Sequence, residues 1–157
     1  MNDNGRAARA VRIYGDMLYR ISIVMLKNHA DAEDAVQDTF IKYMLKSPDF
    51  KSENHEKAWL ITVCSNKCRD MLRKRSRTVG DSEEILRNIA ADEESHDILE
   101  ALLGLPEKFR IVMTLHYVEG YKVNEIAEII GKTSSAVKMR LSKGRTLLNE
   151  LYRKEYL

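Results

Sequence analysis

The sequence predicts an all-α protein: two small helical domains joined by an acidic flexible linker, the C-terminal domain being a helix-turn-helix. Only two prolines and seven glycines interrupt 157 residues, which favours long helices. Apolar residues recur at helical spacing in both halves of the chain. Charge is divided unevenly, with two basic blocks around an acidic stretch. We place the domains at residues 1–76 and 97–157, with the linker at 77–96.

Bulk composition is that of a protein with a packed core. Hydrophobic residues make up 44% of the chain and charged residues 32%, the latter above the roughly 25% of an average globular protein. No run approaches the ~20 apolar residues of a membrane-spanning helix. Met1–Arg12 also lacks the apolar core of a signal peptide. We therefore expect a cytoplasmic protein with no direct membrane insertion.

The first half reads as helices separated by short breaks. The first is expected over Val11–Lys27, and Asp31 is expected to cap a second over Ala32–Leu45. Ser47–Asn54 is predicted to be a loop, followed by a helix from about Glu56 to Arg75. The first two helices carry buried stripes at helical spacing: Ile13, Met17, Leu18, Ile21, Val24 and Met25 in one, and Ala32, Val36, Phe40 and Tyr43 in the other.

Local charge is far from the formal net value of +2. Asn66–Arg77 contains six Lys/Arg against one acid, whereas Asp81–Glu100 contains eight acids against one Arg. Lys132–Asn149 contains five basic residues and no acid. Two basic blocks held apart by an acidic one indicate two modules that bind polyanions. Ordinary solvated helix faces are the alternative interpretation.

The C-terminal part carries a helix-turn-helix pattern. Leu105-Pro106 marks a helix start, because proline suits the first helical position. A short helix over Val123–Ile130 is closed by Gly131. Thr133 can cap a second, longer helix from Ser134 to about Leu151. In a helix-turn-helix the second helix enters the DNA major groove.

Helical geometry sorts this second helix into an inner and an outer face. An acid-free outer face favours DNA binding over the alternative, a surface helix of a bundle, because solvated faces usually mix charge signs. The inner face comprises Val137, Leu141, Gly144, Leu148 and Leu151, and the outer face Lys138, Met139, Ser142 and Lys143, flanked by Arg140 and Arg145.

The two cysteines, Cys64 and Cys68, fall on one helical face with Leu60 and Met71. A redox pair or half of a metal site is conceivable, but no second ligand pair has metal-site spacing. Cysteines one turn apart are more often small buried residues, so we favour core packing. No Gly-rich phosphate loop or nucleophile motif is present. We expect no catalytic residue, no metal and no cofactor.

Both halves resemble conserved regions of bacterial sigma factors, taken in order. The C-terminal half resembles their fourth region in Leu105-Pro106-Glu107 through Tyr117, Glu125-Ile126-Ala127, Gly131, Val137-Lys138 and Arg145. The first half resembles their second region in Asp31-Ala32-Glu33-Asp34-Ala35-Val36-Gln37-Asp38-Thr39-Phe40, Ala58-Trp59-Leu60, Asn66, Asp70 and Arg73-Lys74-Arg75. The chain has no room for the other two regions of primary sigma factors, which points to the minimal extracytoplasmic-function group.

The resemblance implies a role for each surface and three partners: core RNA polymerase, promoter DNA and a cognate anti-sigma factor. Docking on polymerase falls to Asp34, Gln37, Asp38 and Ile41. Capture of the melted minus-ten strand falls to Phe50, Trp59, Val63 and Asn66, with Lys67, Arg69, Arg73, Lys74 and Arg75 around them. Reading of the minus-thirty-five duplex falls to Lys138, Met139, Ser142 and Lys143, with Arg140 and Arg145 on the phosphates. The acidic linker is implied to thread the RNA channel of polymerase, or to be a plain tether.

One departure from the family pattern concerns a helix cap. Lys122 stands where the family often has Ser or Thr, so we expect a weaker cap, or one supplied by Asn124. Two other classes of function compete with the sigma reading. A regulator using the helix-turn-helix alone leaves the acidic and basic blocks of the first half unexplained, and a helical enzyme finds no motif in support.

Overall fold

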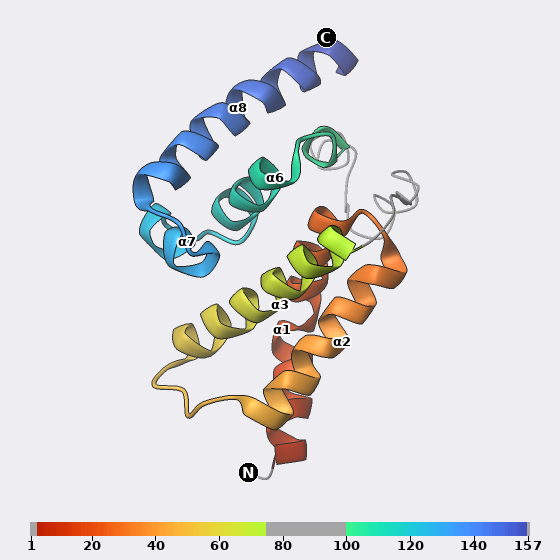
Figure 1. Ribbon diagram of the computed structural model, residues 1–157, viewed down its shortest axis with the longest axis vertical. Coiled ribbons are helices and arrows are strands. Elements are labelled where there is room, and N and C mark those ends of the chain that lie inside the picture. The colour runs from red at the N-terminus through yellow and green to blue at the C-terminus, as the bar shows by residue number, and fades with distance from the viewer. Residues whose placement is uncertain (1–2, 75–99, 157) are drawn as a thin grey trace. The chain divides into compact units, whose positions relative to one another are not determined.

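The structure, a computed structural model, describes residues 3–74 and 100–156 (Figure 1). Every regular element within those ranges is a helix, and the chain divides into two compact units, Met1–Thr78 and Val79–Leu157. The prediction of an all-α protein with two helical domains is thereby confirmed. The predicted linker, residues 77–96, lies wholly outside the described residues. Within the described ranges, no helix combines the length and the apolar character that a membrane crossing requires.

The N-terminal unit is built from α1 (Asp3–Leu26), α2 (His29–Lys46) and α3 (Glu53–Lys74), each packed against the other two (Figure 1). Large side chains from all three helices are fully buried between them. They include Leu18, Ile21, Met25, Tyr43, Leu60 and Ile61. Burial of this apolar surface holds the unit together.

α1 begins eight residues before the predicted start at Val11. Its first turns bury Ala7 and Ala10 rather than large side chains, so the apolar pattern there is weak although alanine favours a helix. The predicted stripe was wrong at Ile13, which is 50% exposed. The stripe runs instead through Ala10 and Tyr14, each at helical spacing from Met17 or Leu18.

The predicted cap of α2 at Asp31 was also wrong. Asn28 is the N-cap, with extended backbone (φ −151°), and its Oδ1 accepts a hydrogen bond of 2.9 Å from the Asp31 N–H. Asp31 lies in the first turn, where its carboxylate favours the helix dipole. Val36, expected in the core, is only half-buried, and Ala35 is fully buried beside it.

The C-terminal unit contains α6 (Glu107–Met113), a π-helical turn η1 (Thr114–Val118), α7 (Val123–Ile130) and α8 (Ser134–Tyr156). α8 packs against both α6 and α7. Pro106 precedes the first residue of α6 as its N-cap and is not the first helical residue. The predicted end of α7 at Ile130 and the predicted start of α8 at Ser134 are both confirmed. α8 runs five residues beyond its predicted end at Leu151.

Two local devices shape the turn between α7 and α8. Gly131 adopts left-handed backbone (φ 69°, ψ 37°), which glycine adopts at no steric cost, and so ends α7. Thr133 Oγ1 then accepts a hydrogen bond of 3.1 Å from the Ala136 N–H, as predicted for the cap of α8. Both contacts span a few residues, which is why the sequence alone revealed them.

The start of α7 departs from the prediction for Asn124. The Lys122 N–H donates to Glu125 Oε1 at 2.9 Å, so the reciprocal half of a capping box is present. A lysine ammonium has no acceptor and cannot supply the other half. Asn124 does not cap α7, because its Oδ1 accepts a hydrogen bond of 2.7 Å from Ser134 Oγ across the turn.

Gly144 permits the close packing of α8 on α6. A Cβ at this position would lie 3.1 Å from both Cγ and Sδ of Met113 and 3.6 Å from Cβ of Phe109. The first two distances are tighter than nearly all real Cβ contacts, so a larger residue would force the two helices apart or displace Met113.

Candidate nucleic-acid interface

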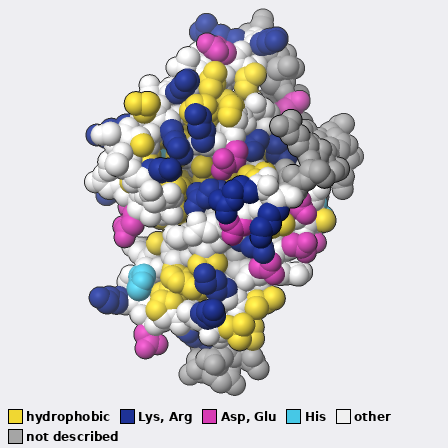
Figure 2. All heavy atoms as spheres, in the orientation of Figure 1, with side chains coloured by type: hydrophobic (Ala, Val, Ile, Leu, Met, Phe, Trp, Pro, Cys, Tyr) yellow, Lys and Arg dark blue, Asp and Glu magenta, His cyan; other side chains and the backbone are white. Residues whose placement is uncertain are grey.

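α8 presents an exposed, acid-free face opposite its packing side. Val137, Leu141 and Gly144 are buried against α6 and α7. The outward side chains expected from helical geometry are all exposed, and Met139 is 70% exposed. They are Lys138, Met139, Ser142 and Lys143. Figure 2 shows Lys and Arg side chains along the visible part of the C-terminal unit. This face offers several hydrogen-bond donors and one soft apolar group.

The two flanking arginines differ in their surroundings. Arg140 is half-buried, whereas Arg145 is exposed and its Nη1 donates a hydrogen bond of 3.1 Å to the Tyr117 hydroxyl. Tyr117 and the neighbouring Val118 are about half exposed on η1, although valine is among the residues most often buried. This contact orients Arg145 and joins residues 28 positions apart, so no local pattern in the sequence predicts it.

The outward face of α2 carries an acidic and apolar stripe. Asp34, Gln37 and Asp38 are exposed, and Ile41 is 52% exposed. Two residues that the sequence analysis did not single out, Met44 and Leu45, extend the stripe and are 45% and 76% exposed. They follow Ile41 by one helical turn, so they lie on the same face. The apolar part of this surface is therefore larger than predicted.

The loop between α2 and α3 is covered by an aromatic cluster. Phe50 stacks on Tyr43 (centroids 5.9 Å apart, interplanar angle 21°) and meets Trp59 edge to face at 5.7 Å. His55 also packs edge to face on Phe50 at 5.2 Å. The structure thus brings together two of the predicted strand-capturing residues, Phe50 and Trp59. Both are only half-buried, so an apolar surface remains accessible.

Val63 and Asn66 lie one and two turns beyond Trp59 on α3, so they share its face. Val63 is half-buried and Asn66 is exposed. The Asn66 amide oxygen accepts a hydrogen bond from the Arg69 guanidinium. The amide nitrogen of this exposed side chain remains available as a donor.

The basic end of α3 is partly neutralised by one acid of α2 and one of its own. Lys67 Nζ lies 3.0 Å from Asp38 Oδ2 of α2, and Arg73 pairs with Asp70. Lys67 was predicted to lie on the DNA-binding surface and Asp38 on the polymerase-binding surface, and the structure joins the two residues in one ion pair. Both ion pairs are well exposed, so they are easily exchanged for other partners.

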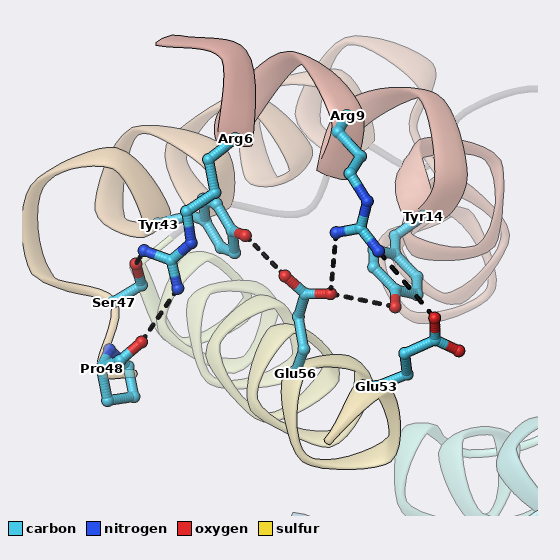
Figure 3. Close-up of polar contacts among 8 residues, drawn as sticks. All are labelled: Arg6, Arg9, Tyr14, Tyr43, Ser47, Pro48, Glu53 and Glu56. Atoms are coloured by element: carbon cyan, nitrogen blue, oxygen red, sulfur yellow. Dashed lines mark hydrogen bonds and ion pairs between the residues drawn. The ribbon is translucent and has the colours of Figure 1, made fainter. Parts of the chain in front are cut away.

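A buried carboxylate ties the N-terminal unit together, and the sequence analysis missed it. Glu56 is 5% exposed and accepts hydrogen bonds from Tyr14 (3.1 Å) and Tyr43 (2.5 Å), while Arg9 Nη1 lies 3.5 Å away (Figure 3). The pKa of Tyr43 is raised to about 12, mainly because the phenol is buried and secondly because it donates a hydrogen bond to Glu56. The same two causes raise the pKa of Tyr14. Glu56 precedes Leu60 by one turn, and that position on the apolar face was the signal in the sequence.

A cavity of about 490 Å³ adjoins this network. Its walls come from the first turns of α1, the α2–α3 loop and the start of α3, and they mix both signs of charge. The lining residues are Arg6, Arg9, Asp49, Phe50, Ser52, Glu53 and Glu56. Phe50 is the only predicted strand-capturing residue among them, so this cavity is distinct from the base pocket that the sequence analysis expected on α3.

The cysteines lie in the core, as favoured from the sequence. Cys64 and Cys68 are free and fully buried, and Cys64 Sγ lies 3.0 Å from Ser22 Oγ. The hydrogen bond to Cys64, together with burial, raises the pKa of Cys68. In the part of the chain that the structure describes, no group of three or more His, Cys, Asp or Glu side chains could hold a metal ion.

Comparison with known proteins assigns both halves of the chain to one family. Residues 10–78 match the family model "Sigma-70 region 2", and residues 95–148 match "Sigma-70, region 4". Similar proteins include the ECF RNA polymerase sigma factor SigW of Bacillus subtilis (28% identical, covering 96% of this chain and 91% of that one). RNA polymerase sigma factor SigV of the same organism is 29% identical and covers 88% of this chain and 86% of its own.

Two solved structures share the fold at 25% sequence identity. The sigma factor RpoE in complex with the anti-sigma factor NepR from Bartonella quintana matches with a TM-score of 0.75, over 94% of this chain and 97% of that one. CnrH in complex with the cytosolic domain of CnrY matches with a TM-score of 0.72, over 95% and 88%. Three findings lead to one conclusion: the two family regions match in order, the similar proteins align along most of the chain, and the solved structures share the fold. The chain belongs to the extracytoplasmic-function sigma factors, which direct promoter-specific transcription by RNA polymerase.

Proposed function

We propose that this sigma factor reads the minus-thirty-five duplex with α8, captures the melted minus-ten strand with the N-terminal unit, and docks on core polymerase through α2. It supplies recognition, and polymerase supplies the chemistry. The observation that carries the proposal is the outward face of α8, exposed and free of acids over Lys132–Asn149. A basic face without acids attracts a polyanion such as DNA.

The chemistry of each outward side chain of α8 determines which contact it makes with the DNA duplex. Lys138, Ser142 and Lys143 donate hydrogen bonds to base edges, guanine being the usual partner of lysine. Met139 offers only apolar contact, which suits a thymine methyl group. The flanking guanidinium groups of Arg140 and Arg145 bind phosphates and set the register of the helix.

Strand capture requires an apolar wall for an unstacked base and a polar group to read its edge. The half-buried rings of Phe50 and Trp59 supply the wall, with Val63 beside them on α3. The exposed amide of Asn66 reads the base. Phosphates near this site are neutralised by basic side chains, each contact adding about one unit to the salt slope of binding. These side chains are Lys67, Arg69, Arg73 and Lys74.

Docking on polymerase uses the stripe on α2. Ile41 is the exposed apolar anchor, and Asp34, Gln37 and Asp38 form its polar rim, the usual composition of a protein interface. The two similar solved structures were each determined with a second protein, an anti-sigma factor in the case of RpoE. We propose that this chain also has a cognate anti-sigma factor.

Selection of promoter fragments by reconstituted holoenzyme tests the whole proposal. Purified chain added to core polymerase should give transcripts from a defined promoter class. A protein that acts through its helix-turn-helix alone would instead bind duplex DNA without core polymerase and give no such transcript.

Substitutions on α8 test the proposed division between base and phosphate contacts. Lys143→Ala should relax selection at one upstream position by about 1–3 kcal/mol. Lys154→Ala, on the same helix three turns further along, is the matched control and should change nothing. Equal weakening on every sequence by Lys143→Ala would show a phosphate contact instead.

Strand capture is tested with Asn66→Ala. This variant should impair promoter opening and leave binding to the duplex upstream element intact. Loss of both activities together would indicate a folding defect and would remove Asn66 from the proposed site.

A further inference from the structure

We propose that Arg6, in the second turn of α1, is a positioning residue for strand capture, because it fixes the α2–α3 loop (residues 47–52) that carries Phe50. The inference rests on the proposed role of Phe50 in binding the melted strand. It goes beyond that role, because it makes the N-terminal end of α1 part of the machinery that sets the base-binding wall.

Arg6 donates two hydrogen bonds to the start of the loop. Its Nη1 donates to Ser47 Oγ and its Nη2 to the Pro48 carbonyl, both at 2.9 Å (Figure 3). In Figure 1 the N-terminal end of α1 lies beside the end of α2, where the loop begins. These bonds join residues 41 and 42 positions apart, so they depend on the packing of α1 against α2.

The second contact is with the aromatic cluster. The guanidinium carbon of Arg6 lies 4.9 Å from the centroid of Tyr43 and 5.2 Å from that of Phe50. These two rings are the stacked pair of the cluster. A cation at these distances is attracted by the ring faces. Arg6 therefore holds the Phe50 ring on Tyr43, whose hydroxyl is itself fixed by buried Glu56.

Few other contacts order the loop. Pro48, Asp49, Lys51 and Ser52 are exposed, so burial contributes little to their placement. At the far end, the Lys51 N–H donates to His55 Nδ1 at 3.1 Å and Ser52 Oγ accepts from the His55 N–H at 3.1 Å. At the start of the loop, the Ser47 N–H donates to the Tyr43 carbonyl at 3.3 Å, and Arg6 holds the Ser47 side chain and the Pro48 carbonyl. Phe50 lies between the two anchored ends.

Arginine is required by this geometry. Its planar guanidinium can donate two hydrogen bonds in its plane and still present its face to the aromatic rings. A lysine ammonium is a point charge and cannot reproduce both contacts. If Arg6 acted only by attracting DNA phosphates, lysine would serve equally well, so Arg6→Lys separates the two roles.

The experiment uses the full chain with core polymerase on a template with a premelted bubble, and 2-aminopurine in the non-template strand of the minus-ten element. Arg6→Gln should weaken strand capture about tenfold, the scale of losing one charge-assisted hydrogen bond with its stacking. Arg6→Lys should recover less than half of that loss. Ser47→Ala, which removes one of the two acceptors, should give a smaller loss than Arg6→Gln.

The matched control is Arg12→Gln, an exposed arginine two turns further along α1. It should leave strand capture unchanged, and all variants should bind the upstream duplex as the parent does. Fluorescence of Trp59, the only tryptophan of the chain, checks that the N-terminal unit is folded at the assay temperature.

Phe50→Ala separates failure of this inference from failure of the proposed function. Weak capture by Phe50→Ala with normal capture by Arg6→Gln overturns the positioning role alone. Full rescue by Arg6→Lys overturns it as well, in favour of a simple charge effect. Normal capture by Phe50→Ala overturns the proposed base contact and the positioning role with it.

Discussion

Replacing Glu56 tests whether the buried network stabilises the N-terminal unit. Glu56→Ala leaves the hydroxyls of Tyr14 and Tyr43 without their common acceptor. Tyr14 is only 7% exposed and Tyr43 only 1% exposed, so water cannot easily replace that acceptor. Each buried hydroxyl left unsatisfied costs about 1–3 kcal/mol. The side chain of Arg9 is 32% exposed and can be hydrated, so it adds little. We expect a loss of about 3–5 kcal/mol in the free energy of unfolding.

Glu56→Gln keeps the volume and one acceptor, so it should cost only about 1–2 kcal/mol and leave the unit folded. Glu53→Gln is the control, because the Glu53 side chain is 86% exposed and lies 4.0 Å from Arg9. An exposed pair of this kind is worth less than about 1 kcal/mol. Urea unfolding followed by Trp59 fluorescence measures both, since this single tryptophan packs on Tyr43 and Phe50 inside the unit.

A double-mutant cycle decides whether the hydroxyls are the cause. Tyr14→Phe should destabilise the parent, and should do so less in the Glu56→Gln background, because the interaction is already weakened there. The reasoning is refuted if Glu56→Gln unfolds at the same urea concentration as Glu53→Gln. It is equally refuted if the effects of Tyr14→Phe and Glu56→Gln simply add.

Three further outcomes are expected. Since the phenol of Tyr43 ionises near pH 10 when unfolded and near 12 when folded, its contribution is complete below pH 10 and is lost as the pH rises to 12. Urea midpoints from Trp59 fluorescence should fall over that window in the parent and less in Tyr43→Phe. Gly144→Leu should destabilise the C-terminal unit by about 1–3 kcal/mol through its clash with Met113, measured by hydrogen exchange of α8 amides. Unchanged exchange would show that the Met113 side chain moves aside at no cost and would contradict this expectation. Thr133→Ala should cost about 1 kcal/mol by the same measurement, and Thr133→Ser should restore it.

Features set by neighbours in the chain were predictable. The turn of the helix-turn-helix depends on Gly131 and Thr133, whose backbone and side chain act within a few residues. The outward face of α8 follows from its 3.6-residue period. Where two local signals competed, the sequence could not decide between them. Asn28 and Asp31 are both good caps, and the structure begins α2 after Asn28.

The contacts that join distant segments were decided by tertiary structure. Glu56 meets Tyr14 across 42 positions, and Arg6 reaches Ser47 across 41, because α1, α2 and α3 pack together at those residues. Nothing in the local pattern around Arg6 reveals that it faces a loop. The sequence by itself determined the family, through the motifs of its two regions. It also determined most of the helices and the outward side of α8, since these depend on short-range periodicity and capping. Only the packed helices decided which polar side chains meet inside the N-terminal unit, because a buried charge is tolerated only where the fold supplies its partners.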